Sequence, residues 1–325
     1  MIEKKREFPK EITILKVILK RFTLNHQRQI ELENKLSRKL AGYKGEKELD
    51  YYLSQIDHTN LKILHDLRIP HNNTHFQIDS LLISNTFLLP IDSKNYAGVL
   101  DFNPEFNYLL QTLNGFEKVY QDPILQTKIQ ASQLKSFLMK NQFSPPPIEF
   151  LVSVSNSQAI IRNPANSTEV ANRVCKTPAV SYKIQSISEK YNKEYLSQKE
   201  VKKIVKLLLK SHVPYIPDIQ SMNLPMDKIQ IGVQCPDCGL LGMEKIHGSW
   251  VCKQCGHLSK DAHIAALKDY FLIFGPHITS RQFSNFLNIP SIHQAKRLLT
   301  SMELDISGSK KGTVYRPKKD FPLWD

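Results

Sequence analysis

Two aspartates and a lysine stand inside an apolar segment, 76-FQIDSLLISNTFLLPIDSKN-95, where unpaired charges are costly to bury. The segment predicts two strands joined by a short polar turn, with Asp79 on the first strand and Asp92 and Lys94 on the second. Alternate residues of a strand share a face, so Asp92 and Lys94 point the same way, and a tight connection brings Asp79 alongside. Two carboxylates can hold Mg²⁺ or Mn²⁺, and Lys94 can orient or deprotonate a water for attack on a phosphate. The alternative is a plain Asp–Lys salt bridge at a strand end.

Other catalytic chemistries have less support. His65, His71 and His75 precede Asp79, and imidazole can bind transition metals, but their spacing matches no metal motif and the polar loop PHNNTH predicts solvent-exposed side chains. The sequence contains neither the G-x-S-x-G of serine hydrolases nor the G-x-x-x-x-G-K-[ST] loop of ATP-binding proteins. A metal-assisted reaction at the two aspartates is therefore the leading hypothesis.

These residues must be positioned by helices and strands, and the expected order of those elements predicts an α/β (α+β) fold with one mixed sheet. In chain order we expect a basic helical segment over 1–42, a helix over 43–57, a strand over 61–69, the two strands of 76–95, short strands over 96–122, a helix over 123–140, strands over 148–155 and 158–162, and further helices over 164–212.

An ordered set of short motifs runs through these elements. It comprises Gly45-Glu46, Phe76-Gln77-Ile78-Asp79, Asp92-Ser93-Lys94-Asn95 with Gly98, and Asp122-Pro123 with Gln126. In this order the set resembles the NERD domain, a nuclease-related family of the PD-(D/E)xK superfamily, over roughly residues 40–155. The resemblance implies a restriction-endonuclease-like core in which Asp79 and Asp92 bind the metal ion and Lys94 is the catalytic lysine. It also implies that Glu46 ligates the metal directly or through water, and that Gln126 contacts the site or the scissile phosphate.

The chain departs from the family pattern in two places. The family usually has Glu-x-Lys, whereas this chain has the shorter Asp92 before Lys94. Pro90 stands inside the strand that carries the motif, and proline cannot donate a hydrogen bond to a neighbouring strand. A strand distorted at Pro90 would misplace Lys94, so a nuclease fold without catalysis is the alternative hypothesis.

Two C-x-x-C pairs form the clearest local motif of the chain. Cys235 and Cys238 are separated from Cys252 and Cys255 by thirteen residues, and each pair predicts a knuckle that offers two thiolates to one Zn²⁺. Four thiolates close the tetrahedral site, so we expect a structural zinc ribbon and not a catalytic zinc. The fifth cysteine, Cys175, is expected to be a buried free thiol.

The segment 277–318 predicts a second DNA-binding module. Thr279 or Ser280 caps a first helix, Ser291 caps a second, and a two-stranded hairpin with a basic tip follows, so that the whole resembles a winged helix. The exposed face of the second helix is expected to meet a major groove and the hairpin to meet phosphates, through the residues His293, Gln294, Lys296, Arg297, Lys310, Lys311 and Arg316. Winged helices also bind proteins, which is the alternative.

The totals favour a polyanionic partner. The 325 residues carry a formal net charge of +13 and a pI of about 9.4, and no apolar run approaches the roughly 18 residues of a membrane span. The N-terminus lacks the apolar core of a signal peptide, and the cysteine pairs suit a reducing compartment, so we expect a cytoplasmic protein.

These observations together predict five parts: a helical segment (1–42), a NERD-like nuclease domain (43–165), a helical extension and linker (166–226), a zinc ribbon (227–258) and a winged helix (259–325). The expected function is metal-dependent hydrolysis of DNA, with no membrane partner, with RNA as a possible substrate, and with a homodimer or a partner protein left open. The alternatives are a DNA-binding protein with a degenerate nuclease fold and an adaptor that binds nucleic acid or protein.

Overall fold

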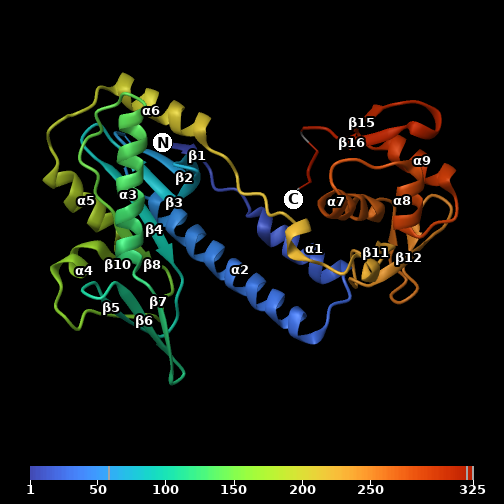
Figure 1. Cartoon of the computed structure of the whole chain (residues 1–325), viewed down its shortest axis with the longest axis horizontal. Coiled ribbons are helices and arrows are strands. Elements are labelled where there is room, and N and C mark those ends of the chain that lie inside the picture. The colour runs from blue at the N-terminus through green and yellow to red at the C-terminus, as the bar shows by residue number, and fades with distance from the viewer. Residues whose placement is uncertain (58, 320, 324–325) are drawn as a thin grey trace. The chain divides into compact units, whose positions relative to one another are not determined.

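The computed structural model describes residues 1–57, 59–319 and 321–323. The chain divides into two compact units (Figure 1). Unit 1 comprises Met1–Glu7 and Arg38–Tyr215, and unit 2 comprises Phe8–Ser37 and Ile216–Asp325. Within the described residues, no helix is both long enough and apolar enough to span a bilayer.

Unit 1 is built on a six-stranded mixed sheet, which confirms the predicted α/β class. Its order is β1 (Ile2–Lys4), β2 (Lys62–His71), β3 (Thr74–Ile83), β4 (Leu88–Lys94), β8 (Leu151–Val154) and β10 (Val174–Lys176). The three central strands β2, β3 and β4 form an antiparallel meander, and β1, β8 and β10 pair in parallel with their neighbours. The two predicted strands of residues 76–95 are β3 and β4.

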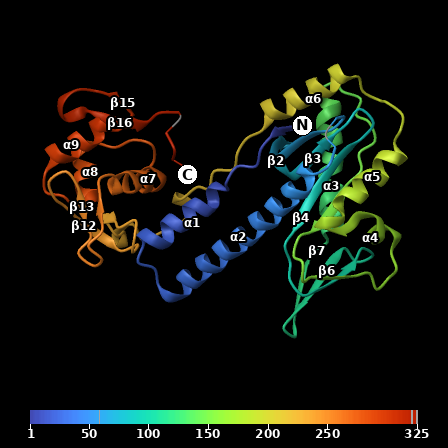
Figure 2. The same ribbon diagram turned by 180° about the vertical axis from the view of Figure 1, so that it is seen from behind.

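Helices cover both faces of this sheet (Figures 1 and 2). On one face, α3 (Pro123–Lys140) and α6 (Gln198–Ser211) pack on β2 and β3. On the other, the end of α2 (His26–Ser54) and α5 (Val180–Lys190) pack on β2, β3 and β4. Successive residues of β3 alternate between these two layers: Leu81 and Ile83 join the first and Leu82 the second. A strand that is buried on both faces must be apolar along its length, which explains why the few charges in it are conspicuous.

A second sheet forms an arm directly after β4. Its order is β7 (Phe116–Gln121), β6 (Tyr108–Leu113), β5 (Val99–Asn103) and β9 (Ile160–Arg162). The turn between β6 and β7 is Asn114-Gly115, and both residues have positive φ, which is the conformation that a tight hairpin requires. The short helix α4 (Thr168–Arg173) and a 3-10 turn (Thr177–Ala179) complete the unit.

The N-terminal segment differs from the predicted helix over 1–42. Ile2–Lys4 form the parallel edge strand β1, and only then does α1 (Lys10–Arg21) begin. Helix α2 runs without a break through residues 42 and 43, where the sequence suggested a boundary. The prediction missed the strand because three residues are too short to show an alternating pattern, and it divided at residue 42 what is one continuous helix.

Unit 2 combines the cysteine segment with a helical segment in one hydrophobic core. The strands β11 (Val233–Gln234), β12 (Leu241–Lys245), β13 (Trp250–Val251) and β14 (Leu258–Ser259) are followed by α7 (Ala262–Phe274), α8 (Ser280–Leu287), α9 (Ile292–Ser301), β15 (Leu304–Ser307) and β16 (Val314–Pro317), with 3-10 turns at Gln220–Met222, Met226–Lys228 and Lys310–Gly312. Trp250, Phe271, Phe283 and Tyr315 belong to a single buried cluster. Helix α1 joins the unit through Arg21, whose buried guanidinium pairs with Asp269 of α7.

Candidate active site

Asp79, Asp92 and Lys94 converge where β3 and β4 separate. The last cross-strand pairs place Ser80 opposite Ile91, so Asp79 and Asp92 are the next facing pair. The Lys94 Nζ lies 3.1 Å from Asp92 Oδ1 and 2.9 Å from Asp92 Oδ2, and the Ser93 backbone N–H donates to Asp79 Oδ2 at 2.9 Å. Asp92 is buried and the Lys94 side chain is 16% exposed, so the lysine faces the acids and not bulk solvent.

Helix α3 brings Gln126 to the same place. Asp122 caps the helix by accepting a hydrogen bond from the Ile124 N–H, and Pro123 occupies its first turn, which fixes where the helix starts. Gln126 then lies one turn in, where its Oε1 accepts a hydrogen bond from Lys94 Nζ at 3.1 Å. The lysine is therefore held from two sides, by a strand and by a helix.

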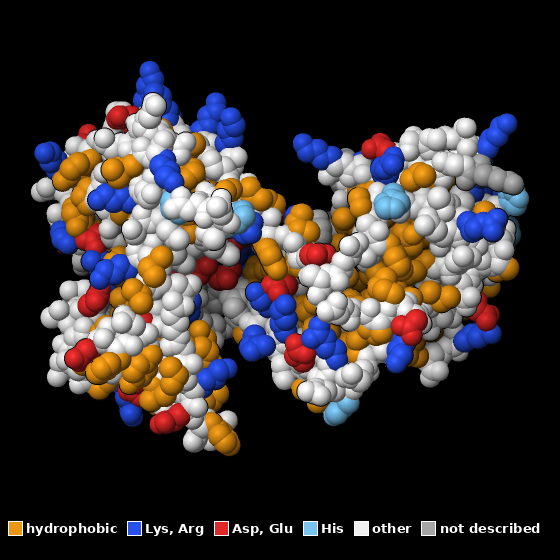
Figure 3. All heavy atoms as spheres, in the orientation of Figure 1, with side chains coloured by type: hydrophobic (Ala, Val, Ile, Leu, Met, Phe, Trp, Pro, Cys, Tyr) orange, Lys and Arg blue, Asp and Glu red, His pale blue; other side chains and the backbone are white. Residues whose placement is uncertain are grey.

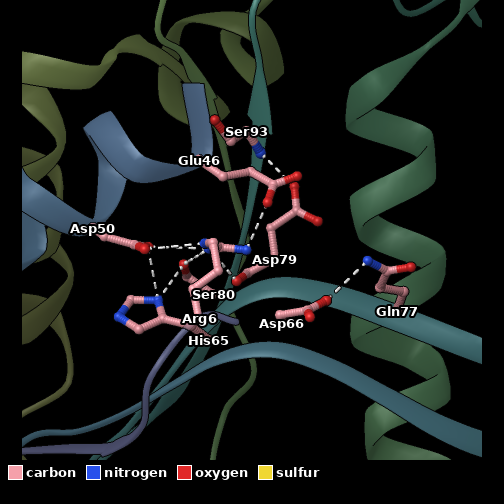
Figure 4. A network of polar contacts seen from close by, with 9 residues as sticks. All are labelled: Arg6, Glu46, Asp50, His65, Asp66, Gln77, Asp79, Ser80 and Ser93. Carbon is pink, nitrogen blue, oxygen red and sulfur yellow. Dashed lines mark hydrogen bonds and ion pairs between the residues drawn. The ribbon is translucent and has the colours of Figure 1, made fainter. Parts of the chain in front are cut away.

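Helix α2 supplies Glu46 from the other side of the site. The adjacent Gly45 allows this approach, because a Cβ at that position would lie 2.3 Å from Ser155 Oγ and 2.9 Å from the Asn95 side chain. Asn95 reinforces the contact by donating to the Ala41 carbonyl at 2.6 Å. Figure 4 shows the Glu46 carboxylate directed at that of Asp79. All five residues of the predicted catalytic set thus lie in one region, on α2, β3, β4 and α3.

Pro90 interrupts the sheet without shifting its register. Leu88 bridges to Ile148, and continuous pairing with β8 resumes at Ile91, which faces Leu151. The offset between the strands is the same on both sides of Pro90, so β4 contains no bulge there. The missing N–H leaves a gap in the ladder two residues before Asp92, and Lys94 still reaches its partners.

A second layer of polar residues supports the acids, and sequence reasoning did not find it. Arg6, which follows β1, forms ion pairs with Glu46 at 2.8 Å and Asp50 at 3.0 Å (Figure 4). Asp50 also lies 3.0 Å from Nδ1 of His65 on β2. The one available signal was the spacing of Glu46 and Asp50, which are four residues apart and so share a face of α2.

His65 is not the exposed loop histidine that the sequence suggested. It is buried, and its Nδ1 lies 2.9 Å from Ser80 Oγ as well as near Asp50. Serine, histidine and aspartate here do not form a hydrolase triad, because such a triad needs the serine and the acid on opposite ring nitrogens. His71 and His75 lie on β2 and β3, and the three histidines do not converge on a metal site within the described residues.

The positive charges of Lys94 and Arg6 do not fully compensate the buried acids of the site. Burial and the charge of Asp92 raise the pKa of Asp79 to about 6, and burial and the charge of Asp79 raise the pKa of Glu46 to about 8, although Arg6 opposes the second shift. Burial lowers the pKa of Lys94, but the charges of Asp92 and Asp79 outweigh it, so that pKa is raised overall. Lys94 is therefore an ammonium at neutral pH and not a ready base.

The acidic residues fit a hard divalent cation. Asp92 Oδ2 is buried and accepts no well-directed hydrogen bond from the described residues, although Lys94 lies within ion-pair distance. Carboxylate oxygens are the ligands that Mg²⁺ and Mn²⁺ prefer, and Mg²⁺ retains several waters, so two or three carboxylates suffice. Glu46, Asp79 and Asp92 do not bring three ligand atoms within 4.8 Å of one another, so the remaining ligands would be water or substrate.

Comparison with known families agrees with this geometry. Residues 41–155 match the family described as nuclease-related domain, NERD. This segment of the chain is a nuclease-related domain. The match covers about a third of the chain and contains Glu46, Asp79, Asp92, Lys94 and Gln126. Comparisons with curated proteins and with solved structures found no match.

Outside the nuclease-related domain, the four predicted zinc ligands form a second candidate metal centre. The Sγ atoms of Cys235, Cys238, Cys252 and Cys255 all lie within 4.8 Å of one another, and two pairs are 3.6 Å apart. A tetrahedral ion with Zn–S bonds of about 2.3 Å separates its sulfurs by roughly 3.8 Å, so the arrangement is compatible with zinc. Cys175 is buried on β10, and burial raises its pKa to about 11, as expected of an inert thiol.

Unit 2 also carries the residues predicted to meet DNA. His293, Gln294, Lys296 and Arg297 are all exposed on α9, where three of them line a shallow depression. Lys310 and Arg316 are exposed, Arg316 donates to Ser307 Oγ, and the side chain of Lys311 lies outside the described residues. Trp250 is fully buried and donates to His263 of α7, so it is a core residue and does not present its ring at the surface.

Proposed function

We propose that the protein is a metal-dependent nuclease that hydrolyses phosphodiester bonds of DNA. The observation that carries the proposal is the convergence of Asp79, Asp92 and Lys94 inside a nuclease-related domain. Asp79 and Asp92 would hold Mg²⁺ or Mn²⁺, with Glu46 joining directly or through water. When bound, the cation supplies positive charge that stabilises the transition state at phosphorus and makes a coordinated water more acidic.

Lys94 would orient the reacting groups. Its ammonium has three N–H donors, and the contacts with Asp92 and Gln126 account for two of them. The third is free to donate to the attacking water or to a phosphate oxygen. In this scheme Lys94 acts as a cation and hydrogen-bond donor, as its contacts with Asp92 and Gln126 favour, and the proton of the attacking water passes to bulk solvent.

Unit 2 would bind the substrate. We propose that its helical part is a winged helix, that α9 meets DNA, and that the cysteine centre holds a structural Zn²⁺. On the face seen in Figure 3, Lys and Arg side chains of both units are interspersed with acids. DNA binding is proposed for the exposed polar face of α9.

The test is cleavage of linear and plasmid DNA by the full chain, with Mg²⁺, with Mn²⁺ and with EDTA. Lys94→Ala should reduce the rate about 10²–10³-fold, a typical value for the loss of one hydrogen-bond donor that stabilises charge in a transition state. Lys128→Ala is the matched control, since Lys128 is an exposed lysine of α3 whose contact is Glu169. If the wild type binds DNA but cleaves neither DNA nor RNA with either metal, the degenerate nuclease fold is the better description.

A further inference from the structure

We propose that Arg6 is a positioning residue of this active site, which holds Glu46 of α2 against Asp79 of β3 so that both carboxylates face one divalent cation. The inference rests on the proposed metal-dependent function. Arg6 lies outside the nuclease-related match at 41–155, and it reaches the site only because β1 joins the edge of the sheet beside β2.

The contacts of Arg6 use nearly every donor of its guanidinium. Nη1 donates to Glu46 Oε2 at 2.8 Å, while Nε and Nη2 donate to the two oxygens of Asp50 at 3.0 Å each. Nη2 also donates to the Asp79 carbonyl at 2.7 Å and lies 3.2 Å from Ser80 Oγ. One side chain thus ties a helix to the strand that carries a proposed metal ligand (Figure 4).

Burial makes this arrangement specific to arginine. The Arg6 side chain is 2% exposed, and its two acid partners are 24% and 12% exposed, so water does not substitute for these contacts easily. A planar guanidinium can bind one carboxylate through two N–H groups and still donate to a second group, whereas a lysine ammonium is a single point charge. Lysine at position 6 would keep the charge but could not bridge α2 and β3 in the same geometry.

The charges explain why a positioning residue is needed here. Glu46, Asp50 and Asp79 are three acids brought together from a helix and a strand, and like charges repel at this range. Arg6 contacts all three residues, through the carboxylates of Glu46 and Asp50 and the backbone carbonyl of Asp79, and its charge compensates the repulsion. It therefore determines how closely Glu46 can approach Asp79 before any cation binds.

A merely structural ion pair would affect stability, whereas a positioning residue affects metal affinity. The experiment therefore measures Mn²⁺ binding by calorimetry on the full chain with zinc present, together with the Mn²⁺ dependence of cleavage. In Arg6→Lys, we expect Mn²⁺ affinity to fall about 10-fold, within the range found when residues that orient metal ligands are replaced. The lost hydrogen bonds of a buried guanidinium should also lower the melting temperature, so Mn²⁺ binding is measured at a temperature where the variant is folded, and KM for DNA should change less than about two-fold.

A second variant guards against misfolding. Arg6→Gln with Asp50→Asn removes one buried charge of each sign and keeps hydrogen-bonding groups at both positions, and it should also weaken Mn²⁺ binding. Arg68→Lys is the matched control, because Arg68 contacts the Val213 carbonyl and the Tyr215 ring and no acid of the site.

Three outcomes would separate the two proposals. Unchanged Mn²⁺ affinity in folded Arg6 variants would overturn the role of Arg6 and leave the nuclease proposal standing. If the Arg6 variants bind Mn²⁺ more weakly but the wild-type protein cleaves no nucleic acid, the positioning role of Arg6 would be supported and the nuclease proposal would be overturned. If Asp92→Asn binds Mn²⁺ as tightly as the wild type does, both proposals would be overturned.

Discussion

The two candidate metal centres of this protein are assembled in opposite ways. The cysteine centre of unit 2 takes all four ligands from residues 235–255, and its sulfurs are already close enough for one ion. The acidic centre of unit 1 takes its residues from a strand pair and two helices, and it is supported by Arg6 from the far end of the chain. The first would close the coordination sphere of an ion with protein ligands, and the second would leave positions open.

This difference predicts different roles for the ions that we propose at the two centres. A closed set of four soft thiolates stabilises a fold and offers no site for a substrate. A set of hard carboxylates with open positions binds its ion more weakly, but it admits water and phosphate.

Cys252→Ser should remove the zinc of unit 2 and disrupt the core built around it. The thiolate is one of four ligands and is buried beside Trp250, and metal binding contributes directly to the folding free energy of so small a sheet. We expect bound zinc to fall from one equivalent to near zero in a chromophoric chelator assay, with rapid hydrogen exchange in β11–β14. In unit 1, exchange should stay at the wild-type level.

Cys175→Ala is the matched control, since it removes a buried thiol that is not part of the quartet. It should retain one equivalent of zinc. If Cys252→Ser still binds one equivalent of zinc, the four cysteines are not the zinc site. The comparison between a closed thiolate centre and an open carboxylate centre would then no longer apply.

The same contrast explains what could be predicted from the sequence. The cysteine centre is local, so its spacing sufficed, and the helix over 123–140 has the limits that the sequence predicted. The convergence of Asp79, Asp92 and Lys94 was also accessible, because a hairpin register is set within twenty residues.

The missed features all depend on contacts between distant segments. Arg6 meets Asp50 only through the packing of an edge strand, and His65 is buried only because β2 lies inside the sheet. No local pattern marks either residue, since a short basic N-terminus and a histidine near a polar loop are common at surfaces. The shared core of unit 2 was missed for the same reason: Trp250 finds its partner His263 on a helix that the sequence reading did not single out.

Gly45→Ala should disturb the acidic centre by moving α2. The new Cβ would lie 2.3 Å from Ser155 Oγ and 2.9 Å from the Asn95 Cβ, so either α2 or the ends of β4 and β8 must shift. We expect a loss of about 1–3 kcal/mol in the free energy of unfolding, as for other overpacked sites, and weaker Mn²⁺ binding because Glu46 is the next residue. Thermal unfolding and calorimetry measure the two effects.

Gly42→Ala on the same helix is the control, because nothing lies within 4 Å of a Cβ there. It should stabilise the protein by up to about 1 kcal/mol through helix propensity alone. If both alanines stabilise equally, α2 does not rely on a close approach at Gly45 to position Glu46.

The stabilities of the two units should respond to pH in opposite directions when no divalent ion is bound to the acids. The pKa of Glu46 is raised from 4.5 to about 8, so the folded state retains a proton that the unfolded state releases, and unit 1 should lose stability as pH rises from 5 to 8. Burial lowers the pKa of His263 from 6.5 to about 4, so unit 2 should lose stability as pH falls through that range. Hydrogen exchange resolved by peptide distinguishes the units.

Glu46→Gln tests the first effect, to which the raised pKa of Asp79 contributes in the same sense, whereas the lowered pKa of His212 in unit 1 acts in the opposite sense. The difference between wild type and Glu46→Gln should grow with pH and should shrink when Mn²⁺ is added, because the cation replaces the proton. If the difference in stability between the two proteins stays constant from pH 5 to 8, Glu46 does not have the raised pKa that we assign to it.

The smallest effect is expected for a single exposed lysine of α9. If Lys296 contacts a phosphate, Lys296→Ala should reduce the slope of log binding constant against log salt by about 0.9 and weaken binding a few-fold, raising KM and leaving kcat unchanged. Lys253→Ala is the control, because Lys253 is an exposed lysine of the same unit that is already paired with Glu244. An unchanged salt slope in Lys296→Ala would remove α9 from the DNA-binding surface. A reduced kcat would instead show that unit 2 contributes to the chemical step, and the division between a catalytic unit and a binding unit would no longer hold.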